Sequence, residues 1–167
     1  MNFSIRCVPF DELSLDELYN IMRFRQEIFV VEQNCPFADA DGKDQVAWHF
    51  MVLDEKHHLV AYTRLFGKNG YYENYTSIGR VATSPKVRGG GVGKFLFQKS
   101  IEKTIEIFGN EPIKIGAQRY LEKFYQSFGF VLTGNNYMED GIEHTIMILP
   151  NFIAPSEADE LIAAPVF

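Results

Sequence analysis

The chain has 167 residues, of which 46% are hydrophobic and 14% aromatic, and this length suits one domain with a single core. Its formal net charge of −6 argues against a protein that coats nucleic acid, because such proteins carry basic surfaces. Two cysteines, Cys7 and Cys35, are too few for a disulfide framework and lack the spacing of a zinc site. No apolar run approaches the roughly 18 residues of a membrane span. We therefore expect a cytoplasmic protein with reduced thiols and without nucleic-acid or membrane partners.

The N-terminal half of the sequence predicts a strand, a helix and three further strands. Residues 3–8 alternate apolar and polar side chains, as strands do, and residues 15–29 keep helical spacing. Ser14 and Glu17 have the spacing of a capping box at the start of that helix. Arg25 is expected to reach toward solvent beside its apolar stripe. Further strands are expected over residues 48–53, 59–66 and 77–83.

The C-terminal half predicts two more helices and three more strands. Apolar residues recur at helical intervals over 92–108, and Gly109 ends the run. The remaining elements expected are a strand over 113–117, a helix over 120–128 and hairpin arms over 130–133 and 143–149. This order indicates a mixed α/β (α+β) fold with a mostly antiparallel central sheet of six to seven strands flanked by helices. Residues 1–150 are expected to form this domain, and residues 151–167 a tail packed on it or partly free.

A glycine-rich loop separates the expected strand 77–83 from the helix that follows. Residues 88–94 read RGGGVGK, which lacks the spacing of a Walker phosphate loop. The dinucleotide pattern GxGxxG also fails, because its third glycine falls on Lys94. What remains is R-x-x-G-x-G, whose glycines let successive backbone N–H groups face an anion at a helix N-terminus. A glycine-rich turn that binds no ligand is the alternative.

Several segments of the chain resemble one enzyme family. The unit IGRVATSPKVRGGGVGKFLFQKSIE resembles the acetyl-CoA-binding motif of the GNAT superfamily of N-acetyltransferases. Three more segments, RQEIFVVEQNCPFADADGKD, AQRYLEKFYQSFGFV and YMEDGIEHTIMIL, resemble the ElaA-like branch of that superfamily and follow in the same order. Together they cover most of residues 20–149. The resemblance implies a GNAT-like fold and transfer of an acetyl group from acetyl-CoA to an amine.

By this resemblance, one end of the central sheet holds the cofactor. The glycine loop would bind the CoA pyrophosphate, and the strand around Val81 would hydrogen-bond the pantetheine arm as a neighbouring strand would. A backbone N–H near Val81 would also face the thioester oxygen. Gln118 matches a family position beside the cofactor, although a polar residue at a strand end needs no such role. The cofactor-binding residues expected are thus Val81, Ala82, Arg88, Gly89, Gly90, Gly91, Val92, Gly93, Lys94 and Gln118.

Acetyl transfer also needs an acid for the leaving thiolate and a base for the amine. Tyr125, in KFYQSFGF, matches a family position for the acid, and a tyrosine with a pKa of about 10 keeps its proton at neutral pH. Packing of a helix on the sheet is the alternative role for Tyr125, and Tyr120 is the alternative acid. On the acceptor side we expect Glu139 to be catalytic and Glu32, Asp140 and His144 to bind substrate. The segment MEDGIEH also reads as a simple polar turn.

The aspartate-rich loop QNCPFADADGKDQ does not predict a metal site. Counting from Asp39, the glycine position of an EF-hand falls on Asp44. By the resemblance, this loop forms a wall of the acceptor site. His49 could face the same pocket, although a lone histidine on a strand is more often structural. Cys35 has no Cys-His-Asn pattern to support thiol chemistry.

The resemblance therefore implies an acyltransferase that uses acetyl-CoA and a small-molecule or peptide amine, by direct transfer in a ternary complex. We expect a monomer or a homodimer and no metal. The alternatives are a non-catalytic CoA-binding module or sensor with the same fold, and a non-enzymatic protein whose loop binds another phosphate ligand. The hydroxyl of Tyr125 favours the enzyme, because a binding module need not keep it.

Overall fold

The computed structural model describes residues 2–150. The strands are β1 (Ser4–Pro9), β2 (Trp48–Leu53), β3 (Leu59–Phe66), β4 (Ser77–Thr83), β5 (Ile113–Gln118), β6 (Val131–Glu139) and β7 (Ile142–Leu149). The α-helices are α1 (Leu15–Arg25), α2 (Val92–Phe108) and α3 (Glu122–Gln126), and a π-helical segment, η2 (Gln26–Glu32), extends α1. The 3-10 turns are η1 (Phe10–Glu12), η3 (Asp44–Val46), η4 (Pro85–Val87) and η5 (Arg119–Leu121). Within residues 2–150, every helix is too short or too polar to cross a membrane.

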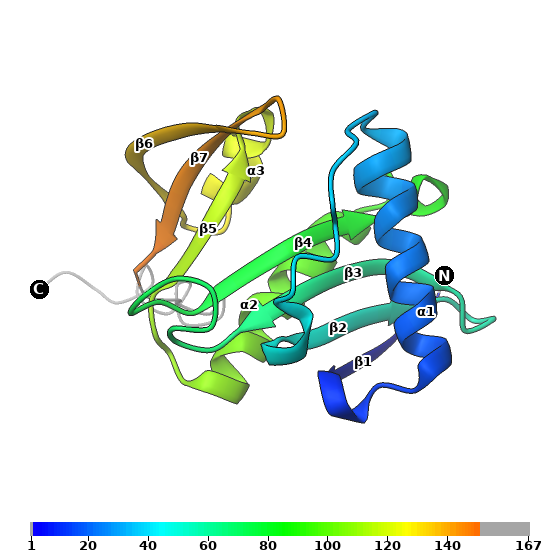
Figure 1. Ribbon diagram of the computed structural model, residues 1–167. Coiled ribbons are helices and arrows are strands. Elements are labelled where there is room, and N and C mark those ends of the chain that lie inside the picture. Colours follow the sequence, from blue (N-terminus) through cyan, green and yellow to red (C-terminus); the bar gives the residue numbers. More distant parts are fainter. Residues whose placement is uncertain (1, 151–167) are drawn as a thin grey trace, which may run out of the picture.

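The strands form two sheets that meet along one short line. One sheet has the order β1-β2-β3-β4 and the other β5-β7-β6, and all pairs within each sheet are antiparallel. The sheets meet through a parallel bridge between Thr76 and Ile113, where the Lys114 N–H donates to the Thr76 carbonyl at 2.9 Å. Beyond this bridge β4 and β5 diverge (Figure 1). Their divergence creates a V-shaped opening between two parallel neighbours.

Helices cover both faces of the four-stranded sheet. The long helix α2 lies on one face and α1 crosses the other (Figure 1). On the α2 face, Leu96, Phe97 and Ile101 pack with residues of both sheets in one core cluster, and on the α1 face Ile21 and Phe24 pack in a second. Because both of its faces are covered, β3 buries seven of its eight residues. Burial of each large apolar side chain contributes about 1.5–3 kcal/mol, so these two clusters hold the walls of the opening in place.

The predicted order of elements and the mixed α/β class are confirmed, with seven strands divided between two sheets. Three expected elements had wrong boundaries. The helix expected over 120–128 is a 3-10 turn, η5, followed by α3, which ends at Gln126. The helix expected to end at residue 29 continues to Glu32 as a π-helix, whose wider turn a 3.6-residue periodicity cannot detect. The hairpin arm expected over 130–133 runs from Val131 to Glu139, because its turn-forming residues 134–136 accompany an irregularity in the pairing with β7. The domain boundary at residue 150 stays a prediction, and the tail after it lies outside the described residues.

Candidate active site

The divergence of β4 and β5 opens a cleft of about 730 Å³. It brings together most of the residues predicted from the sequence, although they come from eight different elements or loops. The predicted residues that line it are Glu32, Val81, Ala82, Arg88, Gln118, Tyr125, Glu139, Asp140 and His144. The rest of the glycine loop, residues 89–94, follows Arg88 beyond the lining. A cleft of this volume is large enough for a drug-sized ligand.

The glycine loop ends at the N-terminus of α2. Gly91 is the N-cap residue with a φ of +81°, which L side chains rarely adopt, and Gly89 has a φ of +83°. No side chain caps the helix, so its first-turn N–H groups remain for another acceptor. A β-carbon built at Gly91 would meet no atom within 4 Å, so the space before the helix is open. The loop therefore fits a phosphate held by backbone N–H groups and by the positive end of the helix dipole.

Arg88 joins this loop to the opposite rim of the cleft. Its two terminal nitrogens donate to the Glu32 carboxylate at 2.7 and 3.2 Å, and its guanidinium also donates to the Thr83 carbonyl. Both side chains are partly exposed, at 42% for Arg88 and 38% for Glu32. The structure thus places Glu32 beside the predicted pyrophosphate loop, whereas we had expected it at the acceptor side.

A β-bulge interrupts β4 in the middle of the cleft. Tyr62 on β3 pairs with Ala82, but Arg64 pairs with Gly79, so β4 has one residue more than β3 over this stretch. Arg80 takes the left-handed conformation, with a φ of +50°, and Arg80 and Val81 both line the cleft. At a bulge, backbone N–H and C=O groups of the extra residue are left without a partner in the neighbouring strand. Strand periodicity does not predict a non-glycine residue in this conformation within β4.

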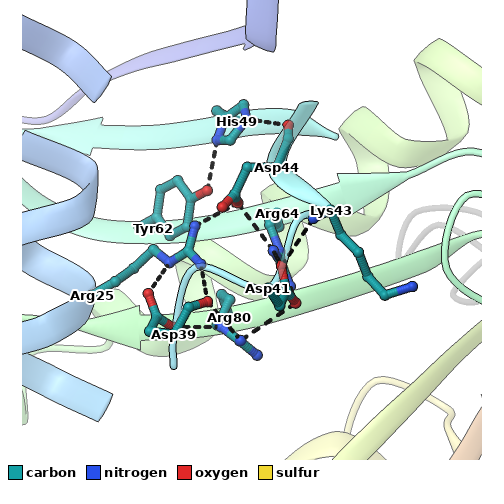
Figure 2. Close-up of polar contacts among 9 residues, drawn as sticks. All are labelled: Arg25, Asp39, Asp41, Lys43, Asp44, His49, Tyr62, Arg64 and Arg80. Atoms are coloured by element: carbon teal, nitrogen blue, oxygen red, sulfur yellow. Dashed lines mark hydrogen bonds and ion pairs between the residues drawn. The ribbon is translucent and has the colours of Figure 1, made fainter. Parts of the chain in front are cut away.

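Buried ion pairs hold this bulge, as Figure 2 shows. Asp39 accepts from Nε of Arg80 with one carboxylate oxygen and from Nε of Arg25 with the other, both at 2.8 Å. The Asp39 carbonyl accepts a further bond from each arginine, at 2.9 and 3.1 Å. Arg25 is completely buried, so our expectation that it would reach solvent was wrong: its guanidinium turns inward to these acceptors. Two elements distant in sequence, α1 and β4, are thereby fastened to one aspartate.

The same network continues to β3 through Arg64. Its guanidinium donates to both Asp41 oxygens at 2.7 and 2.8 Å and to Asp44 at 3.0 Å, and Asp44 also accepts from Arg25 at 2.6 Å. Burial opposes ionisation of Asp41 and Asp44, but the hydrogen bonds and charges of these arginines outweigh it and lower both pKa values. All three carboxylates accept from arginines, and of the three only Asp41 lines the cleft. No group of residues in the described part of the chain could hold a metal ion.

His49 belongs to the network and not to the cleft lining. Its Nε2–H donates to the Asp44 carbonyl at 3.0 Å, and its Nδ1 accepts from the Tyr62 hydroxyl at 2.7 Å. The ring is fully buried, and this burial lowers the pKa of His49. The structural alternative for His49 is therefore the one that the geometry supports.

Tyrosines form the facing wall of the cleft. A β-carbon built at Gly116 on β5 would lie 2.2 Å from the Tyr137 hydroxyl oxygen and 3.2 Å from that of Tyr72. The Tyr137 ring stacks on His144, with centroids 5.2 Å apart and planes at 23°. Burial, and next the charge of Glu139, raise the pKa of Tyr137 to about 12, so it stays protonated. Sequence reasoning missed both tyrosines, because nothing local marks which of eight tyrosines meet across strands.

His144 and Glu139 lie next to these tyrosines. The Nδ1–H of His144 donates to the Ile142 carbonyl at 2.8 Å, so Nε2 is the ring nitrogen that faces away from this bond. That Nε2 lies 3.7 Å from a carboxylate oxygen of Glu139. The His144 side chain is only 10% exposed and that of Glu139 is 52% exposed. The adjacent turn is tied to the loop after η2 by Cys35, whose thiol donates to the Asp140 carbonyl at 3.3 Å.

Tyr125 lies on α3, in the core cluster that also contains residues of α2, and it lines the cleft from there. Only 5% of it is exposed, and it has edge contacts with Phe97 at 5.0 Å and Phe124 at 5.2 Å. Burial, and next the nearby Tyr120, raise the pKa of Tyr125, so its phenol is a proton donor at neutral pH. Within residues 2–150 no hydrogen-bond partner meets its hydroxyl, and Tyr120 is 73% exposed. The two roles considered for Tyr125, helix packing and lining of a site, are compatible.

Comparisons with known proteins point to one family. The model of a family described as "Acetyltransferase (GNAT) domain" matches residues 32–150, more than half of the chain. Protein ElaA of Escherichia coli is 42% identical over 134 residues, covering 80% of this chain and 87% of that protein. A UPF0039 protein of Synechocystis is 40% identical over 139 residues, covering 83% and 90%.

Solved structures agree with the family model. The crystal structure of E. coli ElaA has a TM-score of 0.80 and 35% identity, covering 87% of this chain and 99% of that one. An acyl-CoA N-acyltransferase from Pseudomonas aeruginosa has a TM-score of 0.81 and 34% identity, covering 87% and 98%. A CoA-dependent acyl-homoserine lactone synthase, solved with isopentyl-CoA, shares the fold at 17% identity, with a TM-score of 0.75 and coverage of 99% and 92%.

Proposed function

Because the chain belongs to the GNAT acetyltransferase family, we propose that it transfers an acetyl group from acetyl-CoA to a primary amine, directly and within a ternary complex. The acceptor is a small molecule or a peptide amine. The single observation that carries the proposal is the meeting, in one cleft, of Arg88 beside the glycine loop, the Tyr125 hydroxyl and His144. These groups supply a cofactor anchor, an acid and a base. We propose the reaction in the cytoplasm, by a monomer or a homodimer.

The glycine loop and β4 would hold acetyl-CoA. The free N–H groups at the start of α2, with the N-cap at Gly91, match the two phosphates of a pyrophosphate. Arg88 would exchange the Glu32 carboxylate for a phosphate oxygen, which a partly exposed ion pair permits. Val81, Ala82 and Gln118 line the path of the pantetheine arm between β4 and β5. Acetyl-CoA supplies an activated thioester, and a backbone N–H of the bulge at Val81 would polarise its carbonyl.

Residues of two different elements, Tyr125 of α3 and His144 of β7, would carry out the proton transfers. As the C–S bond breaks, Tyr125 would donate its proton to the leaving sulfur, and its raised pKa keeps that proton available. The second proton, which the nitrogen loses once it has bonded to the carbonyl carbon, would return through solvent to Tyr125. His144 would accept a proton from the acceptor ammonium at Nε2, since its Nδ1–H already donates to the Ile142 carbonyl. Glu139 would stabilise the resulting imidazolium from 3.7 Å and pass the proton to solvent. This division makes His144 the base and Glu139 its partner, and Asp140 lies at the entrance for the amine.

Release of free CoA with a panel of primary amines tests the proposal. We expect turnover with at least one amine, and we expect Tyr125→Phe to lower kcat by about 10²-fold, the usual contribution of a positioned acid. Isothermal titration should show that Tyr125→Phe binds acetyl-CoA as well as the wild type. Gly91→Asp should lose that binding, because it combines a strained φ with a negative charge at the phosphate site.

The controls separate the competing interpretations. Tyr19→Phe changes an exposed tyrosine on α1 and should leave both readouts unchanged. An unchanged rate in Tyr125→Phe, with a slowed Tyr120→Phe, would assign the acid to Tyr120. Tight binding of acetyl-CoA with no release of CoA for any amine would favour the alternative, a non-catalytic CoA-binding module.

A further inference from the structure

The narrow end of the cleft lies where β4 and β5 come together. The two strands run parallel from the bridge between Thr76 and Ile113. Three residues further along each strand lie Gly79 on β4 and Gly116 on β5, and both line the cleft. A strand advances about 3.3 Å per residue, so these glycines face the cleft about 10 Å from the bridge. The opening is therefore still narrow at this level and widens toward the C-terminal ends of the strands.

The glycine loop sets the direction in which a thioester would enter. It follows the C-terminal end of β4, at Thr83, which is the wide end of the cleft. A pantetheine arm that runs along β4 from this loop points toward the narrow end. Its carbonyl would meet the bulge at Val81, as the proposed function requires, and the next residues toward the bridge are Arg80 and Gly79. An acyl chain longer than acetyl would thus extend toward the level of Gly79 and Gly116.

Two phenolic hydroxyls occupy that level. The hydroxyl oxygen of Tyr137 lies so close to the Gly116 α-carbon that a β-carbon there would be 2.2 Å from it, and that of Tyr72 would be 3.2 Å away. Such distances mean that glycine is required at residue 116 to accommodate the Tyr137 ring. Both side chains line the cleft and neither is fully exposed. The two hydroxyls therefore lie over Gly116 of β5, at the level that a longer acyl chain would reach.

Contacts on both sides hold this pair in place. The Tyr137 ring stacks on the His144 ring. The His144 ring is in turn held by the hydrogen bond from its Nδ1–H to the Ile142 carbonyl. The Tyr72 ring has an edge contact with Tyr71, with centroids 4.9 Å apart, and carries the Lys114 ammonium 4.8 Å from its centre. Rings supported in this way cannot swing aside at low cost, because their rotamers are restricted by neighbours from three segments.

We infer that Tyr72 and Tyr137, seated over Gly116, form the end wall of the acyl site and restrict the transferred group to acetyl. This inference rests on the proposed function and adds the residues that choose among acyl-CoA donors. In a closed site, one additional methylene changes discrimination by about 10–200-fold. Butyryl-CoA, with two additional methylenes, should therefore react at least about tenfold less efficiently than acetyl-CoA in the wild type.

The test compares acetyl-, propionyl- and butyryl-CoA in the full-length protein, by titration calorimetry and by CoA release. Tyr137→Leu and the double variant Tyr72→Phe/Tyr137→Phe open the end wall, and each should reduce the preference for acetyl over butyryl by about tenfold. Tyr75→Leu is the matched control, because Tyr75 also lies against Lys114 but does not line the cleft. It should keep the wild-type preference.

The outcomes separate this inference from the proposed function. Equal use of acetyl- and butyryl-CoA by the wild type overturns the inference, and so does an unchanged preference in both wall variants. A change in acceptor KM with an unchanged donor preference also overturns it, since the tyrosines would then contact the amine. If thioesters bind with the predicted length preference but no amine is acetylated, only the proposed function fails. If no CoA thioester binds, both fail.

Discussion

The two walls of the cleft use their polar groups in opposite ways. On the wall formed by β3 and β4, here called the β4 wall, Arg64 and Arg80 donate to buried or partly buried aspartates at distances of 2.7 to 3.0 Å. On the β5–β7 wall, the acceptor nitrogen of His144 has only a carboxylate at 3.7 Å, and the Tyr137 hydroxyl lies against a glycine. The charged groups of the first wall hold the backbone, whereas the second wall keeps the Nε2 nitrogen of His144 available for a ligand.

The free-energy cost of burying a charged group explains why the charges of the β4 wall are paired. A carboxylate as buried as Asp39 is tolerated only with partners that satisfy both oxygens, and the arginine fork supplies them. Once Arg25 and Arg80 share that aspartate, the left-handed residue in β4 is fixed, and with it the backbone that would face the thioester. A site that must orient a reactive carbonyl benefits from such support behind it.

The largest effect should come from breaking the support at Asp39. Asp39→Asn keeps the shape of the side chain but leaves Arg25 and Arg80 without their shared negative charge. Removing one partner of a buried ion pair costs about 3–5 kcal/mol, so the free energy of unfolding should fall by that amount. Urea denaturation measures it. Where the variant still folds, its kcat should fall more than its acetyl-CoA affinity, because the bulge loses its orientation.

An exposed pair gives the matched control. Glu27→Gln removes the partner of Arg23 on the same helical segment, where both side chains are more than 60% exposed, and should change stability by less than about 1 kcal/mol. If Asp39→Asn were as mild as Glu27→Gln, the β4 wall would not depend on its ion pairs and the contrast between the walls would disappear.

The next effect concerns catalysis at the other wall. His144→Asn removes the proposed base, and kcat/KM for the amine should fall by about 10²-fold at neutral pH. The loss should shrink as the pH approaches about 10, because an alkyl amine with a pKa of about 10.4 then loses its proton in solution. A pH series of initial rates from pH 7 to 10 measures this convergence.

His58→Asn is the control for this series, since His58 is 71% exposed and lies away from the cleft. It should follow the wild type at every pH. A loss in His144→Asn of the same factor at all pH values would identify His144 as a residue that supports Tyr137 by stacking, and proton transfer would then fall to water or Glu139.

Much of the fold could be predicted from the sequence because its signals are local. The boundaries of β2, β3, β4 and α2 follow directly from period-2 and period-3.6 patterns and from the glycines beside α2. The capping box of Ser14 and Glu17 is present as predicted. One cleft is lined by Val81, Ala82, Arg88, Gln118 and Tyr125, as the family resemblance implied. These residues could be predicted together only because the resemblance supplied long-range information that periodicity lacks.

The rest depended on contacts between distant segments. Arg25 looked like a surface residue because its partners, Asp39 and Asp44, belong to an irregular loop whose path has no periodic signal. Tyr137 lay between the hairpin arms expected over 130–133 and 143–149, and its closeness to Gly116 arises only through the pairing of β6 and β5 with β7. Glu32 was expected near the amine, but the π-helix directs it to Arg88.

The smallest effect is a pH dependence of stability that arises from His49, in the buried network behind the β4 wall. Burial lowers the pKa of His49 below the value of about 6.5 that it has when unfolded. The unfolded chain therefore binds the extra proton first, so the contribution is complete above about pH 6.5 and is lost as the pH falls below it. The slope for one such group is at most about 1.4 kcal/mol per pH unit. Asp41 and Asp44, whose pKa values are lowered, stay ionised in this range and add no slope.

Urea denaturation between pH 7.5 and 5.5 isolates this contribution when the wild type is compared with His49→Gln. The glutamine amide can donate to the Asp44 carbonyl and accept from Tyr62, but it cannot take up a proton. The wild type should lose about 1 kcal/mol more than the variant over this interval, and His58→Gln, at an exposed histidine, should behave as the wild type. Parallel curves for wild type and His49→Gln would contradict this prediction, because they would mean that the buried His49 ring takes up a proton without loss of stability.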